Sequence, residues 1–221
     1  MADLHCYAWK APIIIEVARE VGNSSVVMWV DSGAAITQPL ANVVAAARAN
    51  GGYVSDETAK GVARFSHEGT LDYFEANFGL DSSVVGELKS KRARGEPGLD
   101  STADLSAGLA KFRNCNGAFS AHVFGGPRFE SVSKHWLACS LVKDCVCPPK
   151  SHRGNHRQDQ AALTLLSIMD GYVCGTDGKF VAAHGLRNAQ HILQAHGVHS
   201  AKELTDKEIF CAQNATAAVA R

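Results

Sequence analysis

The sequence predicts an α/β protein, in which helices and strands alternate along one chain. Two observations support this prediction. Segment 26–30 is a short, largely β-branched apolar run bounded by polar or small residues, which is typical of a strand buried on both faces. Segments 11–21 and 40–50, on either side of it, carry apolar residues at helical spacing. With 221 residues, 46% of them hydrophobic, the chain is long enough to bury a sizeable core.

The remaining elements are assigned from the same patterns. Pro12 suits the first turn of the helix at 11–21, and Gly22 ends that helix. Segment 88–106 is rich in Lys, Arg, Gly, Pro and Ser, and it predicts an exposed loop. Helices are further predicted at 70–78, 128–142, 159–169, 187–195 and 201–218, and strands at 118–123, 172–174 and 180–182.

Charge and hydropathy exclude some classes of partner. The chain carries 22 basic and 22 acidic residues, so no basic surplus favours nucleic acid as a partner. No apolar run is long enough for a transmembrane segment in this chain. The first residues lack the basic and apolar regions of a signal peptide.

Seven cysteines are many for a chain of this size. Cys139, Cys145 and Cys147 lie close together, but their spacing does not match a standard zinc site. Two interpretations stay open: a local disulfide from Cys139 to Cys145 or Cys147 in an oxidising compartment, or three reduced thiols.

Asp31 is the first candidate for chemistry. It ends the apolar run 26–30 and is followed by Ser32 and Gly33. Open α/β sheets bind ligands beyond the carboxyl ends of their strands, and small residues let a ligand approach the backbone. Asp-Ser-Gly is also a common turn sequence, so a purely structural role for Asp31 remains an alternative.

A second candidate region lies at 152–160. It holds two histidines and two arginines before a strongly apolar helix, and Arg153 and Arg157 are suited to bind an anion. Asp159 lies at the start of that helix, where it is either a capping residue or part of a site. His184, before Gly185, is either a ligand-facing or a structural histidine. Dinucleotide, Walker and serine-hydrolase motifs do not occur.

Taken in order, these segments resemble nucleotide-diphospho-sugar transferase-like proteins of the GT-A fold, over roughly residues 7–188. The motifs that carry the resemblance are Trp9-Lys10-Ala11-Pro12, Trp29-Val30-Asp31-Ser32-Gly33, Asn116-Gly117, Trp136 with Cys139, Cys145 and Pro148, and His156-Arg157-Gln158-Asp159-Gln160. The implied fold is a mixed sheet flanked by helices. It would occupy residues 1–197, possess an incomplete N-terminal nucleotide-binding portion, and be followed by a helical extension at 198–221.

The resemblance implies a glycosyltransferase that moves a hexose from a nucleotide-diphospho-sugar to a hydroxyl of a glycan, protein or lipid. Asp159 and Gln160 would lie beside the transferred sugar. Mn²⁺ or Mg²⁺ would be held by Asp31 and His184 and neutralise the departing diphosphate. The other implied roles are donor or phosphate binding by Lys10, Asp31, Ser32, Gly33 and Arg157, and an acceptor side formed by Asn116, Gly117 and His156.

Gly33 departs from the family pattern, because it stands where an Asp-x-Asp motif has its second carboxylate. An alternative is therefore a catalytically inactive module of the same fold that binds a glycan or a protein partner. A weaker alternative is a metal hydrolase that uses Asp31, His156, Asp159 and His184. The family likeness and the cysteines favour the secretory pathway or Golgi lumen, although a cytoplasmic location is not excluded.

Overall fold

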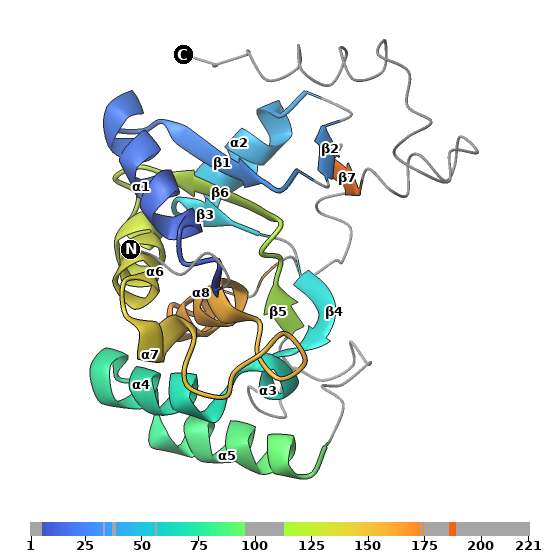
Figure 1. The fold of residues 1–221 in the computed structure, drawn as a ribbon. Helices are drawn as coiled ribbons and strands as arrows, with labels where there is room; N and C mark the ends of the chain where they lie inside the picture. Colours follow the sequence, from blue (N-terminus) through green and yellow to red (C-terminus); the bar gives the residue numbers. More distant parts are fainter. Residues whose placement is uncertain are drawn as a thin grey trace, which may run out of the picture.

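The computed structural model describes residues 6–32, 34–36, 39–55, 57–95, 113–172, 174 and 186–188. This part is a mixed α/β structure, so the predicted class is confirmed at that level (Figure 1). The elements are α1 (Lys10–Val21), β1 (Val26–Val30), β2 (Ala34–Ile36), α2 (Ala41–Ala49), β3 (Tyr53–Val54), β4 (Glu57–Gly61), α3 (Val62–Phe65), α4 (Glu68–Phe78), α5 (Ser82–Ala93), β5 (Arg113–Cys115), β6 (Phe119–Val123), η3 (Phe129–Ser133), α6 (Lys134–Ser140), α7 (Lys143–Val146), α8 (Gln158–Met169) and β7 (Leu186–Asn188).

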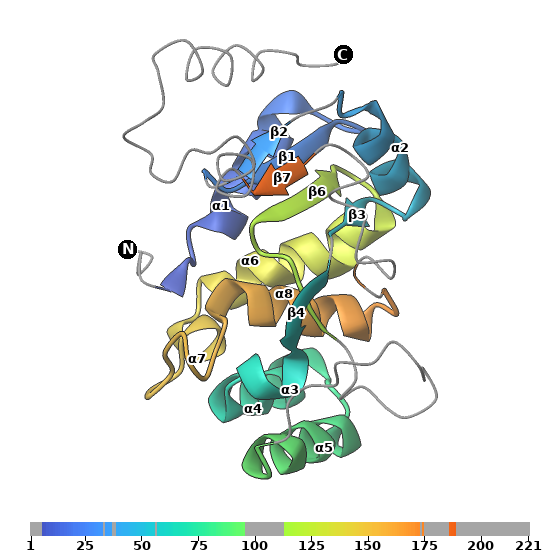
Figure 2. The same ribbon diagram turned by 90° about the vertical axis from the view of Figure 1, so that its right-hand side faces the viewer.

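The main sheet has the strand order β1–β6–β3, and both pairs are antiparallel. Two further antiparallel pairs, β2 with β7 and β4 with β5, are separate from it. Helices α1 and α2 contact the main sheet, while α8 contacts α6 and β5. In Figures 1 and 2, α4 and α5 lie at the end of the molecule opposite the main sheet, and α8 lies between this helix pair and the sheet.

The expectation that segment 26–30 is buried on both faces is wrong. These residues form β1, as predicted, but β1 is an edge strand of the main sheet in which only Val27 is buried. All five residues of the central strand β6 are buried instead. An apolar run alone does not distinguish an edge strand from a central one, because the strand order depends on segments far away in the sequence.

Strand β6 is fully buried although it carries polar side chains, because these side chains form hydrogen bonds. His122 lies between the hydroxyls of Ser133, at 2.7 Å from Nδ1, and Ser120, at 2.9 Å from Nε2. The ring stacks on Trp136 at 6.0 Å between centroids. Burial lowers the pKa of His122 to about 3, so the ring is neutral. Hydrogen bonding lets these polar residues occupy the core.

Several predicted elements are confirmed within one or two residues: α1, β1, α2, α4, β6 and α8. The predicted helix at 128–142 is present as two segments, η3 and α6, the first of which is π-helical. The predicted elements at 180–182 and 201–218, like the extension at 198–221, lie outside the described residues.

Three sequence assignments need correction. The predicted loop at 88–106 begins inside α5, which Asp81 caps and which buries Val85 and Leu88. The basic residues of α5 are only partly exposed, and Arg92 donates hydrogen bonds to three backbone carbonyls, so composition alone did not predict this helix. Leu186–Asn188 form β7 rather than the start of a helix, because they pair with β2. Tyr172 and Cys174 lie outside any strand.

Three disulfides link the described cysteines. The local alternative is confirmed for Cys139 and Cys145, whose Cα atoms are 5.3 Å apart. The other two join distant segments: Cys6 with Cys147, and Cys115 with Cys174. Disulfides persist in oxidising compartments, which is consistent with the expected secretory environment at that coarse level. Of the helices in the described ranges, none has the length and apolar character that a membrane span requires.

Candidate functional site

The structure brings together residues that the sequence places far apart. The ammonium of Lys10 lies 3.0 Å from Asp31 Oδ1 and 3.6 Å from Asp159 Oδ2, and it donates a 2.8 Å hydrogen bond to the carbonyl of Gly117. We call these four groups the Lys10 cluster. They come from the first turn of α1, the end of β1, the first turn of α8 and the turn after β5. Four predicted site residues therefore converge on one point.

The cluster is buried on one side and open on the other. The side chains of Lys10 and Asp159 are 5% and 6% exposed, whereas that of Asp31 is 39% exposed. Trp29 holds the Asp31 carboxylate through a 2.6 Å hydrogen bond from Nε1 to Oδ1. Asp31 is thus the member of the cluster that a ligand can reach.

Asp159 is a carboxyl group in an environment that disfavours its charge. Burial raises its pKa to about 7, with a smaller contribution from the charge of Asp31, and the ammonium of Lys10 opposes this increase. Its Oδ2 atom is buried without a hydrogen-bond partner and has only the longer ion pair with Lys10. Near neutral pH Asp159 therefore exists in both protonation states, a property often found at functional sites.

Gln160 and Asn116 shape the loop that presents the Gly117 carbonyl. Gln160 Nε2 donates a 2.6 Å hydrogen bond to the carbonyl of Cys115. Asn116 Oδ1 accepts one of 2.9 Å from the amide of Ala118. A Cβ on Gly117 would lie 3.1 Å from the Cβ of Gln160, so glycine allows the loop to approach α8. The side chains of Gln160 and Asn116, both predicted site residues, therefore form hydrogen bonds with the loop backbone.

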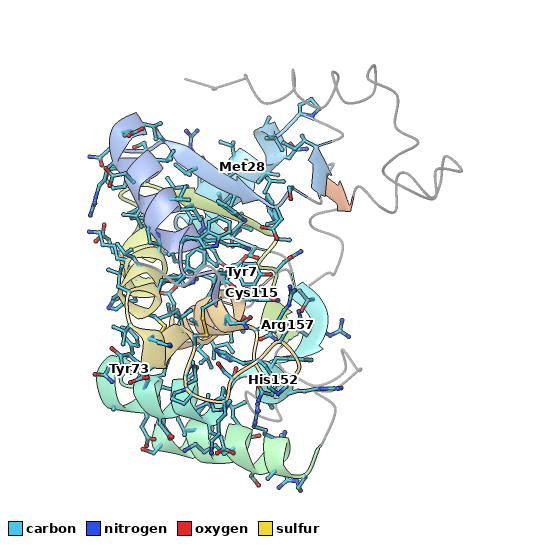
Figure 3. All side chains as sticks on the ribbon, in the orientation of Figure 1. Tyr7, Met28, Tyr73, Cys115, His152 and Arg157 are labelled. Atoms are coloured by element: carbon cyan, nitrogen blue, oxygen red, sulfur yellow. A yellow bond between two sulfur atoms is a disulfide. The ribbon has the colours of Figure 1, made fainter. Side chains whose placement is uncertain are left out.

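The two arginines of segment 152–160 differ in their surroundings. Arg153 is exposed and donates a 2.7 Å hydrogen bond from Nη1 to the hydroxyl of Tyr7. Arg157 precedes α8, its guanidinium lies 5.1 Å from the Phe65 ring centroid, and its Nε is buried without a hydrogen-bond partner. In the view of Figure 3, Tyr7 and Arg157 lie between the main sheet and the α4–α5 end of the molecule. Arg153 lies beside Tyr7, whose ring also contacts the Lys10 ammonium, so this arginine adds positive charge near the Lys10 cluster.

His156, predicted for the acceptor side, is 0% exposed and belongs to a different group of contacts. Its Nδ1 lies 3.1 Å from the amide of His67, and its Nε2 lies 3.3 Å from Thr70 Oγ1 and 3.1 Å from the carbonyl of Val146. We call these groups the His156 cluster. Burial lowers the pKa of His156 to about 4, so the ring is neutral, and it connects the chain at His67 and Thr70 with Val146. This geometry supports a structural role.

The predicted metal ligands do not form a metal site within the described residues. Asp31 Oδ1 already contacts the Lys10 ammonium and the Trp29 indole, and no group of three His, Cys, Asp or Glu side chains with metal-binding geometry occurs in that part of the chain. His184 and Gly33 lie outside the described residues. Ser32 is exposed beside Asp31. With the Lys10 ammonium in contact with Asp31, the described residues leave no free place there for the implied Mn²⁺ or Mg²⁺, and the pairing of Asp31 with His184 stays a prediction.

Sequence reasoning missed the aromatic side chains beside the cluster as site residues. The Lys10 ammonium lies 5.3 Å from the ring centroid of Tyr7 and 5.4 Å from that of Trp29. Trp9 packs edge-on against Trp29 at 5.1 Å between centroids. All three aromatic residues are partly exposed. Tyr7 and Trp9 lie close to Lys10 in the sequence, but spacing alone does not show that the rings of Tyr7 and Trp29 lie beside its ammonium.

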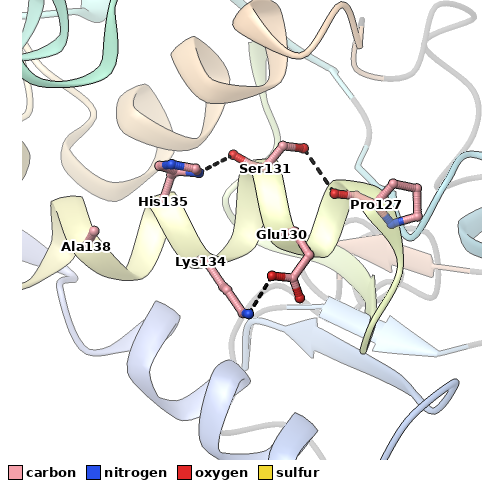
Figure 4. A pocket seen from close by; sticks show the side chains of 6 residues that line it. All are labelled: Pro127, Glu130, Ser131, Lys134, His135 and Ala138. Atoms are coloured by element: carbon pink, nitrogen blue, oxygen red, sulfur yellow. Dashed lines mark hydrogen bonds and ion pairs between the residues drawn. The ribbon is translucent and has the colours of Figure 1, made fainter.

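A hollow on the outer side of η3 and α6 is a separate feature (Figure 4). Its lining residues are Pro127, Glu130, Ser131, Lys134, His135 and Ala138. Its polar groups bind each other: Glu130 pairs with Lys134, and the carbonyl of Ser131 contacts His135 Nδ1 at 2.8 Å. These pairings make the hollow a weaker candidate than the Lys10 cluster.

The chain matches no known family model, and no curated protein or solved structure is significantly similar to it. The candidate site therefore has to be judged on its own geometry.

Proposed function

We propose that this protein is a glycosyltransferase domain that transfers a hexose from a nucleotide-diphospho-sugar to a hydroxyl acceptor on a glycan, protein or lipid. The observation that carries the proposal is the convergence of Lys10, Asp31, Gly117 and Asp159 in one partly open cluster. The family likeness names these residues from separate motifs, and the contacts between them support that grouping.

The groups around the cluster suit the parts of such a donor. The half-exposed Asp31 carboxylate accepts hydrogen bonds from sugar hydroxyls. The partly exposed rings of Tyr7 and Trp29 offer apolar faces against which the C–H groups of a sugar ring pack. The guanidinium groups of Arg153 and Arg157 match phosphate oxygens in geometry and charge.

In this proposal Asp159, Gly117 and Gln160 hold the Lys10 ammonium and Asp31 in place. Asp159 lies behind Lys10 and fixes the position of the ammonium that holds Asp31. Gln160 and Gly117 fix the loop carbonyl that is the third acceptor on Lys10. No step of the proposed reaction uses a metal ion, because the Lys10 ammonium already occupies the described oxygen donors.

The proposal rests on the site rather than on the sheet. A GT-A sheet is for the most part parallel, whereas the main sheet here is antiparallel. The disulfides support a luminal compartment such as the Golgi.

The experiment is a sugar-nucleotide turnover assay on the whole chain, in which release of UDP from UDP-hexoses is measured with and without Mn²⁺. Asp31→Asn is expected to lower turnover roughly 100-fold, because a charged acceptor at the reacting centre is lost. Asp144→Asn, an exposed carboxylate on α7, is the matched control and should keep full activity. Equal turnover by the wild type and Asp31→Asn would reject this assignment.

A second candidate is a binding module of the same kind without transferase activity. It is favoured by the ion pair between Lys10 and Asp31, which leaves Asp31 already neutralised. Binding of oligosaccharides, measured by calorimetry and lost in Trp29→Ala, together with no UDP release from any UDP-hexose, would select this candidate.

A further inference from the structure

The position of the Lys10 ammonium has the features of a cation-binding site. Three oxygen atoms surround it: Asp31 Oδ1 at 3.0 Å, the Gly117 carbonyl at 2.8 Å and Asp159 Oδ2 at 3.6 Å. Carboxylate and carbonyl oxygens are also the preferred ligands of Mg²⁺, Ca²⁺ and Mn²⁺. The donor set is therefore one that a divalent metal would use, but a lysine side chain fills it.

The surroundings of Lys10 stabilise the positive charge of its ammonium and fix its position. The rings of Tyr7 and Trp29 lie 5.3 and 5.4 Å from the ammonium, and the negative face of an aromatic ring attracts positive charge. Lys10 itself lies in the first turn of α1, and the disulfide from Cys6 to Cys147 tethers the segment that precedes it. The ammonium is thus held in place from several directions.

A divalent cation would compete with this arrangement. A metal bound by Asp31 would approach the Lys10 ammonium, which shares the same carboxylate, and like charges at such distances repel. The second carboxylate, Asp159, is 6% exposed and pairs with the same ammonium, so a metal bound by both carboxylates would have to displace Lys10.

We infer that the ammonium of Lys10 takes the place of a divalent cation between Asp31, Asp159 and the Gly117 carbonyl, so that the wild-type site needs no metal and binds one only when the lysine is removed. The inference concerns the site of the proposed function, but it is measured by metal binding and holds or fails independently of glycosyl transfer.

The test compares metal binding by the whole chain as wild type and as Lys10→Met, which keeps the length of the side chain and removes its charge. Thermal unfolding and calorimetric titration are followed with Mn²⁺ alone, at the same pH for every variant. The wild type is expected to show no Asp31-dependent binding. Lys10→Met is expected to bind Mn²⁺, with a rise in Tm of about 5 °C at about 100 times the Kd.

Controls separate this site from binding elsewhere on the surface. Lys10→Met with Asp31→Asn removes one of the three oxygen donors and should lose most of the Mn²⁺ effect. Lys10→Arg keeps the positive charge and should bind no more Mn²⁺ than the wild type.

Each outcome decides the matter. If Lys10→Met folds only when Mn²⁺ or Mg²⁺ is present, the inference is supported. If Lys10→Met stays unfolded with metal, or folds and binds none, the oxygen cage is not a cation site. Mn²⁺ binding by the wild type that Asp31→Asn abolishes would overturn the inference, because Asp31 would then hold a metal beside Lys10.

Discussion

The Lys10 cluster and the His156 cluster are two buried polar groups that differ in how completely their atoms are paired. Both ring nitrogens of His156 have neutral partners on well-packed segments, and the side chain is fully buried. In the Lys10 cluster, Asp159 Oδ2 lacks a hydrogen bond and Asp31 is 39% exposed. One cluster is closed and electrically neutral, while the other is charged, incompletely paired and open to solvent.

This difference distinguishes a structural role from a functional one for the buried polar residues of segment 152–160. A buried polar group whose partners are all satisfied stabilises a fold, since removing any partner exposes an unpaired group. Buried charges with incomplete pairing are costly and are typical of functional sites. By this criterion we expect His156 to be structural and Asp159 to belong to the candidate site, although they lie only three positions apart.

The largest expected effect comes from the disulfide that links the two clusters. Cys6 precedes Lys10, and Cys147 follows Val146, whose carbonyl contacts His156. Replacing Cys6 and Cys147 by Ala should lower the free energy of unfolding by about 5 kcal/mol, because this bond closes a loop with a sequence separation of 141 residues. Urea unfolding measures the loss.

The matched control is the pair Cys139→Ala and Cys145→Ala, which opens a loop with a separation of 6 residues. Its expected cost is about 2 kcal/mol. Equal losses for the two pairs would contradict the view that the long-range bond joins the two clusters.

His156→Ala should destabilise the protein by about 3 kcal/mol, because it leaves a cavity and unpaired groups in a closed cluster. Chemical denaturation followed by circular dichroism measures this. His135→Ala, at an exposed position on α6, is the control and should change stability by less than about 0.5 kcal/mol. A similar small effect for His156→Ala would mean that the His156 cluster is not structural.

The two clusters should respond to pH in opposite directions. The pKa of Asp159 is raised from 3.8 to about 7, so its stabilising contribution is complete below pH 3.8 and is lost as pH rises to 7. Asp159→Asn removes this loss. The free energy of unfolding of Asp159→Asn, relative to that of the wild type, should therefore increase between pH 4 and 7 by on the order of 2 kcal/mol.

For His156, whose pKa is lowered from 6.5 to about 4, the contribution is complete above pH 6.5 and is lost as pH falls to 4. The difference in free energy of unfolding between the wild type and His156→Ala should therefore become smaller as the pH falls to 4. Free energies of unfolding at a series of pH values test both signs. Parallel pH profiles for the wild type and Asp159→Asn would show that Asp159 is not held in a disfavoured charge state.

Gly117→Ala is expected to have the smallest effect, about 1 kcal/mol, because the new methyl group meets the Cβ of Gln160 at 3.1 Å and the loop has to shift slightly. The shift moves the Gly117 carbonyl away from Lys10. Thermal unfolding measures it, with Gly86→Ala on α5 as a control, since nothing lies within 4 Å of a Cβ there. Gly86→Ala should be neutral or slightly stabilising.

The sequence determined the features that depend on neighbouring residues. Helical periodicity predicted α1, α2, α4 and α8, and the apolar run predicted β1. It also selected Lys10, Asp31 and Asp159 as candidates. Composition misled at 88–106, where the basic residues concealed the end of helix α5, which buries Val85 and Leu88.

Only the tertiary structure decided which of these residues meet. Three observations depend on contacts between segments far apart in the sequence. Strand β1 lies at the edge of an antiparallel sheet, Lys10 bridges Asp31 and Asp159, and His156 binds backbone groups of Phe65 and Val146. Periodicity reports only which face of a segment is apolar. The partner on the other side of that face is set by the packing of the whole chain, and here it placed the Lys10 ammonium against Asp31, one of the two predicted metal ligands.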